Sequence, residues 1–294
     1  MKIFHHNDID GRCAAAIVKK AIDEGRLVDV LHPEPEFFEM DYKTEIPVAT
    51  IALDEAVVIV DFSFEPKDMN LVLKMTQQIV WIDHHKTAKT YLDEYDCEVK
   101  GLQDFTTPGK SGAELAWEYF FPNSPMPRAV KLVGDHDTWR WEHGEETASF
   151  HEGLGLEDQS PSSDMWRTLL YEAVYNMETS RIKEILRNGE ISIRYRNNFC
   201  LDYCRTYGFE TKFEGYKCYA LNLYRFGSIG FGEKIDFYDI CISFAFDGAK
   251  YSVGLYTKRK DLDLGAIAKK HGGGGHQQAA GFVCTTLPNF LKRA

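Results

Sequence analysis

The chain has 294 residues, of which 44% are hydrophobic and 27% charged, a composition typical of a globular protein large enough for two domains. Its formal net charge of −11 argues against a protein that coats long duplex nucleic acid, because such proteins are normally basic. No apolar run reaches the length of a membrane span, and polar residues follow directly after the opening MKIF, so we expect a cytoplasmic protein with no signal peptide and no membrane partner.

Strand and helix patterns alternate over the first part of the chain. Short strands are predicted at KIFHH (2–6), VVIVDF (57–62) and IVWIDHH (79–85). Helices are predicted at 11–25, where Gly25 is the stop signal, and at 66–78 and 111–121. This alternation predicts an α/β domain whose sheet is largely parallel and flanked by helices.

The pattern changes in the second half. It is mainly helical at 162–174 and 178–208, and after Gly208 strands are predicted at 216–223, 237–248 and 250–258, with a hairpin at DGAK (247–250) and a helix at 263–275 that glycines terminate. We therefore predict an N-terminal domain over 1–190, a helical connector over 191–206 and a smaller C-terminal α+β domain over 207–294.

The seven cysteines form no CxxC pair, and their odd number argues against a disulfide framework or a zinc ribbon. Cys200 and Cys204 stand at helical spacing. We interpret them as packing residues, with a metal role as the weaker alternative.

Aspartates close three of the apolar or strand-like runs. Asp8 and Asp10 follow the first predicted strand, and Asp61 and Asp83 end the next two. Because the carboxyl ends of parallel strands meet at one edge of a sheet, these side chains are expected to lie together. Each aspartate alone could be a helix N-cap, but four carboxylates so close would repel strongly unless a cation held them.

Histidines accompany these aspartates, His6 at the first strand and His84 at the third. A mixed carboxylate and imidazole set without thiolates suits Mn²⁺ or a similar ion better than Ca²⁺. Two such ions about 3.5–4 Å apart could activate water and stabilise an in-line phosphoryl displacement. Asp137 in DHDTW could complete the set, but spacing alone leaves Asp135 and a helix end with packed tryptophans as alternatives.

The C-terminal stretch HGGGGHQQAAGF suggests a second binding element. Consecutive glycines can point backbone N–H groups at an anion, so Gly273, Gly274 and Gly275 with His276 are candidate phosphate contacts, against a simple turn as the alternative. Ser111 precedes a predicted helix and is either its N-cap or a phosphate contact, the cap being the simpler interpretation. Two basic patches, Lys258–Lys260 and Lys269–Lys270, are most simply solvated surface.

Taken in order, HNDIDG, the Asp of VIVDFS, DHH, DHDTW and GGGGHQQAAGF resemble the motifs of the DHH/DHHA1 phosphoesterase superfamily. The resemblance implies an N-terminal DHH domain that holds two Mn²⁺ ions and a DHHA1 domain that binds substrate. It also implies a set of metal ligands, among which Asp61 bridges the two ions: His6, Asp8, Asp10, Asp61, His84 and Asp137. Asp83 would orient its neighbours, and His85 would face the phosphate.

One departure concerns an Arg that many members of the family carry in a strand of the second domain, where this chain has Tyr256. Lys258 or Arg259 could supply the lost charge, and Arg259 is our candidate. The position of the first histidine, two residues before Asp8, is similar to the oligoribonuclease (nanoRNase) branch and argues against the inorganic pyrophosphatase branch.

The function that follows from this resemblance is manganese-dependent hydrolysis of short oligonucleotides or small nucleotides to nucleoside monophosphates. The alternatives are an exopolyphosphatase, a 3′,5′-bisphosphate nucleotide phosphatase, or a nucleotide sensor without catalysis. The expected partners are short single strands and no long duplex, and a homodimer is left open.

Overall fold

The structure, a computed structural model, describes residues 1–29, 34–175, 180–223 and 226–292, and the chain divides into two compact units, Met1–Ser192 and Ile193–Ala294. The first contains strands β1 (Lys2–His6), β2 (Glu36–Met40), β3 (Val57–Val60), β4 (Ile79–Asp83) and β5 (Lys100–Gln103). Its helices are α1 (Ile9–Asp23), α2 (Pro66–Leu73), α3 (Gly112–Phe120), α4 (Arg128–Asp137), α5 (Glu145–Leu154) and α6 (Asp164–Tyr175). Helix α7 (Ser180–Tyr207) contains the boundary between the units.

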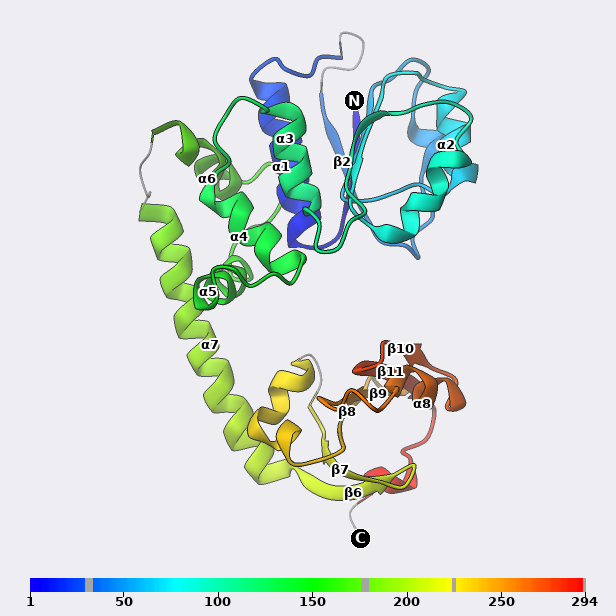
Figure 1. Cartoon of the computed structure of the whole chain (residues 1–294), viewed down its shortest axis with the longest axis vertical. Helices are drawn as coiled ribbons and strands as arrows, with labels where there is room; N and C mark the ends of the chain where they lie inside the picture. The colour runs from blue at the N-terminus through cyan, green and yellow to red at the C-terminus, as the bar shows by residue number, and fades with distance from the viewer. Residues whose placement is uncertain (30–33, 176–179, 224–225, 293–294) are drawn as a thin grey trace. The chain divides into compact units, whose positions relative to one another are not determined.

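The five strands of the first unit form one parallel sheet in the order β2-β1-β3-β4-β5. Helices α1 and α3 lie on one side of this sheet and α2 lies on the other (Figure 1). Alternate residues of each central strand face opposite cores: Val58 packs with α1 and α3, and Ile59 packs with α2. Every residue of β3 is buried, which explains its unbroken apolar sequence. The predicted α/β class and flanking helices are confirmed.

Two predicted helix boundaries were wrong. Helix α1 begins at Ile9, two residues early, because the Asp8 side chain caps it by accepting a hydrogen bond from the Gly11 N–H at 2.9 Å. Helix α2 ends at Leu73 instead of continuing to residue 78, because the Gln77 side chain turns back and donates to the Leu73 carbonyl at 2.7 Å. The predicted start of the second long helix at residue 178 lies outside the described residues.

The second unit is built on a sheet in the order β10-β11-β9-β8-β7-β6, antiparallel except between β7 and β8. Its elements are β6 (Phe209–Phe213), β7 (Tyr216–Leu221), β8 (Ile240–Phe246), β9 (Tyr251–Tyr256), α8 (Leu264–Lys270), β10 (Gly274–Gly275) and β11 (Ala279–Cys284). The DGAK hairpin joins β8 to β9 as predicted, with the Asp247 side chain accepting from the Lys250 N–H at 2.7 Å.

All seven cysteines are free, and both Cys200 and Cys204 are buried, as the packing interpretation requires. Among the described residues, no helix combines the length and the apolar character that crossing a membrane would need.

Candidate metal centre

Three adjacent parallel strands bring the predicted aspartates to one edge of the first sheet. Strands β1, β3 and β4 are neighbours, and Asp8, Asp61 and Asp83 lie after or at their carboxyl ends. The convergence expected from the sequence is therefore present. It extends to α4, whose last residue is Asp137.

Within the described part of the chain, the side chains that could bind a metal fall into three sets whose donor atoms lie within 4.8 Å of one another. We call their members together the acidic cluster. The sets are Asp61, His84 and His85; His6, Asp8 and Asp61; and Asp10, His84 and Asp137. All six residues that the resemblance implied as ligands are thus close together, and their role as ligands stays a prediction.

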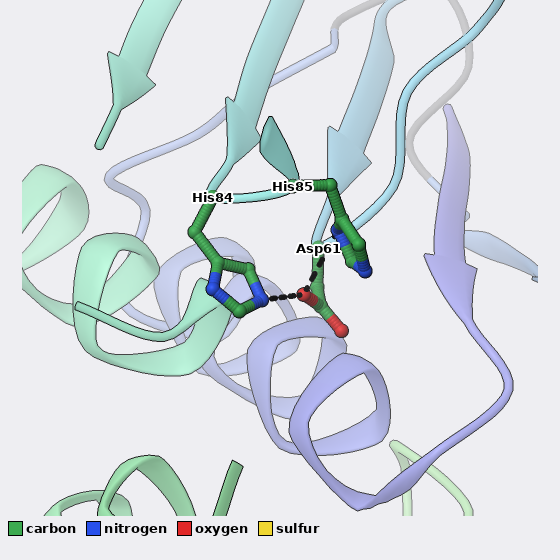
Figure 2. A group of neighbouring side chains, drawn as sticks. All are labelled: Asp61, His84 and His85. Atoms are coloured by element: carbon green, nitrogen blue, oxygen red, sulfur yellow. Dashed lines mark ion pairs between the residues drawn. The ribbon is translucent and has the colours of Figure 1, made fainter. Parts of the chain in front are cut away.

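Asp61 stands at the middle of the acidic cluster. Its Oδ1 is 3.1 Å from His84 Nε2, and its Oδ2 is 3.8 Å from His6 Nδ1, so the carboxylate spans two of the sets. Figure 2 shows Asp61 with His84 and His85 directed at it from the segment that follows β4. The residue has φ +52°, a left-handed conformation that aspartate adopts more readily than most residues.

Buried polar atoms that make no hydrogen bond test whether the cluster suits a metal. Among the described residues, both carboxylate oxygens of Asp61 and Oδ2 of Asp137 are such atoms. Burial raises the pKa of Asp61 well above its ordinary value, and the nearby Asp10 and Asp8 raise it further. Oxygens buried without donors and crowded by like charge are what a divalent cation would stabilise, so this donor set fits Mn²⁺ or a related ion.

Asp10 and Asp137 are held differently within the cluster. Asp10 accepts hydrogen bonds from the N–H groups of Gly112 (2.7 Å) and Ala113 (3.2 Å) at the start of α3. Burial nevertheless raises the pKa of Asp10. Burial and the neighbouring Asp10 and Asp8 raise the pKa of Asp137 to about 9. Without a cation, full ionisation of all the carboxylates in the cluster is therefore unfavourable.

Asp8 is the N-cap of α1 and also contacts His6, so its capping role is shown and its role as a ligand stays a prediction. Its Oδ1 caps α1, and its Oδ2 lies 2.6 Å from His6 Nδ1. Burial opposes ionisation of Asp8, but the contacts with His6 and the cap lower its pKa to about 2.

Asp83 is completely buried and organises the histidine pair. Its Oδ1 accepts from the His84 N–H (2.8 Å) and lies 2.8 Å from His85 Nδ1, while Ser63 donates to its Oδ2. Asp83 belongs to none of the three donor sets, a position consistent with the orienting role that the resemblance implies. Burial lowers the pKa of His85, but the bond to Asp83 outweighs this and raises it overall.

The hydrogen bonds of Asp135 and Asp137 favour Asp137 as the ligand, which stays a prediction. The carboxylate of Asp135 accepts from the N–H groups of Glu142 (2.8 Å) and His143 (3.1 Å) and from the Thr147 hydroxyl. It is therefore committed to the chain around the start of α5. Asp137 Oδ2 instead lies 3.4 Å from His84 Nε2.

Two residues near the cluster were missed at the level of sequence. The Tyr42 ring lies 5.8 Å from that of His6 and 5.6 Å from that of His85, although no motif marks it. Gly112 is needed for close approach, because a Cβ there would stand 2.4 Å from the Asp61 Cβ. The signal that could have identified Gly112 is its place directly after Ser111, at the first position of a predicted helix.

Ser111 is the N-cap of α3 and forms a capping box with Glu114, so the simpler interpretation is confirmed. Its side chain is completely buried, which does not favour the alternative phosphate contact. Arg259, the candidate substrate contact in the second unit, pairs with Asp239 and Asp261.

The glycine stretch of the second unit is ordered as strand β10 against β11. The N–H groups of Gly273 and His276 donate to the carbonyls of Ala268 (2.9 Å) and Ala279 (2.8 Å). A Cβ on Gly273 would approach the Gly281 carbonyl oxygen to 2.0 Å, so close packing against β11 explains why this residue is a glycine. The proposed phosphate contacts rest on Gly274, Gly275 and the exposed His276 side chain, and they stay a prediction.

Comparison with known proteins agrees with this architecture. Residues 1–133 match the DHH family, N-terminal domain. The chain is 20% identical to oligoribonuclease NrnB of Bacillus subtilis (strain 168) over 308 residues, 96% of this chain and 72% of that protein. It is 27% identical over 251 residues to the uncharacterized protein R106 of Acanthamoeba polyphaga mimivirus, covering 80% of this chain and about half, 54%, of that relative.

Two solved structures show the same fold. One is the pGpG-specific phosphodiesterase PggH of Vibrio cholerae, with a TM-score of 0.54 at 13% identity over 97% of this chain and 92% of the other. The second is the DHH domain of a member of the s1p family of ribosomal proteins, with a TM-score of 0.56 at 15% identity over 95% and 81%. Residues 1–133 of this chain therefore match the N-terminal domain of the DHH family, and the chain shares its fold with these two structures.

Proposed function

We propose that this chain is a manganese-dependent phosphodiesterase that hydrolyses short oligonucleotides or small nucleotides to nucleoside monophosphates. The observation that carries the proposal is the acidic cluster, in which Asp61 spans two donor sets and keeps its oxygens free of hydrogen bonds. The similarity to NrnB, which is named an oligoribonuclease, and the fold of a pGpG-specific phosphodiesterase support the substrate class.

The residues of the cluster would have different roles in metal binding and in substrate binding. His6, Asp8 and Asp61 would hold one ion, Asp10, His84 and Asp137 the other, and Asp61 would face both. Bound metals would supply Lewis acidity and a water of lowered pKa. Asp83 holds His85 through Nδ1, and in the imidazolium form, which the raised pKa of His85 favours, Nε2 would donate to a phosphate oxygen. The α3 N-terminus fixes Asp10 through two N–H groups.

A substrate panel in Mn²⁺, resolved by product chromatography, tests the proposal. It contains a diribonucleotide, pGpG, inorganic polyphosphate and adenosine 3′,5′-bisphosphate. We expect nucleoside monophosphates from the first two. If phosphate is released only from polyphosphate, or only from the bisphosphate, and the dinucleotides are not cleaved, the protein is the corresponding phosphatase and the proposal is wrong. Binding of dinucleotide without turnover would replace it by a sensor.

A further inference from the structure

Helix α4 ends at Asp137, and the residue that follows its C-cap, where a glycine is normally found, is Trp139. The Trp139 N–H donates to the His136 carbonyl and the Arg140 N–H to the Asp135 carbonyl, both at 3.1 Å. This pair of bonds is a Schellman motif, in which the residue at the position of Trp139 must be left-handed and is usually glycine. Trp139 has φ +58°.

Packing does not explain this tryptophan. Its ring is 5.0 Å from that of Trp141 and 5.6 Å from that of His136, yet the side chain remains 68% exposed. A left-handed backbone costs a non-glycine residue about 1–2 kcal/mol. Stability alone would therefore favour glycine here, and strain of this kind concentrates at functional sites.

The loop that carries the ring is fixed on both sides. The Arg140 guanidinium donates to the Glu114 carboxylate (2.7 Å) and to the Gly109 carbonyl (3.3 Å). The N–H groups of Glu142 and His143 are bound to Asp135. The exposed indole thus stands on a backbone held in place before any ligand binds, which lowers the entropy cost of a contact.

We propose that the Trp139 indole stacks on a nucleobase of the nucleotide whose phosphate binds at the acidic cluster. Trp139 is two residues from Asp137, so their Cα atoms are at most about 7.6 Å apart. An exposed aromatic face accepts any base, because every base has a π-face. The inference rests on the proposed function, and it identifies a residue that recognises the base, where the cluster recognises phosphate.

The test is calorimetric titration in Mn²⁺ of wild type, Trp139→Gly and Trp139→Phe with two ligands that need no turnover. Adenosine 5′-monophosphate carries a base, and ribose 5-phosphate does not. Loss of one stacked base predicts that Trp139→Gly weakens binding of the monophosphate by about 5- to 150-fold. Ribose 5-phosphate affinity should be unchanged, and Trp139→Phe should restore most of the loss. Trp139→Gly should also unfold at a temperature no lower than wild type, because glycine suits the left-handed position.

Equal affinity of wild type and Trp139→Gly for the monophosphate would overturn the inference. An equal loss for both ligands would also overturn it, since that result would mean a displaced cluster. If Trp139→Gly abolishes self-association and leaves monophosphate binding intact, the ring belongs to an interface and the inference fails. If the base-dependent loss is found but wild type cleaves no dinucleotide, the stacking contact stands and the hydrolytic function fails.

Discussion

At the scale of single residues, the acidic cluster shows which residues of a site can be predicted from the sequence. The convergence of His6, Asp8, Asp61 and His84 could be predicted, because each lies at or within two residues of the end of a strand whose neighbours are parallel. The role of Asp135 could not, because it depends on N–H groups that α5 places in space rather than in sequence. Tyr42 was missed because its place beside His6 and His85 likewise depends on the fold and not on a sequence motif.

The two aspartates of DHDTW form a matched pair of variants. Asp137→Asn should weaken Mn²⁺ binding by at least about tenfold, the effect expected even for groups that only support a ligand. It should not lower the stability of the metal-free protein, because it removes a carboxylate whose pKa burial and like charge raise to about 9. Asp135→Asn should cost about 1–3 kcal/mol of unfolding free energy and leave Mn²⁺ affinity unchanged. Calorimetric Mn²⁺ titration and urea unfolding measure both, and the reverse pattern would exchange the assignments.

The neighbouring histidines should fail in different ways. His84→Ala should lower the metal content of the folded protein, because His84 Nε2 faces both Asp61 and Asp137. His85→Ala should keep the metal and reduce turnover, because its Nδ1 is bound to Asp83. His85 also belongs to one donor set, so elemental analysis of both folded variants is decisive: equal metal loss would make His85 a ligand.

At the scale of elements, the start of α3 supports the cluster. Its N–H groups bind Asp10, and its first residue, Gly112, packs directly on Asp61. The buried central strands β3 and β4 were predictable from their apolar runs. The edge strands β2 and β5 were not, because a partly exposed edge requires no apolar pattern.

A methyl group at the start of α3 should therefore disable the cluster. In Gly112→Ala the new Cβ would overlap the Asp61 Cβ, with no flexible side chain able to yield. We expect Mn²⁺ binding and turnover to fall together, with about 1–3 kcal/mol lost from the unfolding free energy. Gly155→Ala is the control, since its Cβ would come no closer than 3.2 Å to a carbonyl. Normal Mn²⁺ affinity in Gly112→Ala would show that α3 does not position Asp61.

At the scale of the whole molecule, the excess of acidic residues bears on substrate length. The formal charge of −11 opposes binding of an extended polyanion, which requires a basic track. The sequence predicted a second α+β unit with its central strands. It did not predict strand β10, because four consecutive glycines signal a turn as readily as a strand.

Dinucleotides to roughly pentanucleotides should accordingly be cut at least about tenfold faster than long single strands of matched ends at moderate salt. Turnover of RNA oligomers of increasing length, compared by kcat/KM, measures this preference. Equal efficiency on long strands would indicate a processive exonuclease.

The most direct measurement follows Mn²⁺ added back to metal-stripped protein, with bound ions counted by calorimetry and dinucleotide cleavage recorded in parallel. We predict two ions per chain and turnover that returns only as they bind, with both lost in Asp61→Asn. Full turnover by the stripped protein in excess EDTA, or no Mn²⁺ binding by the folded wild type, would contradict the account.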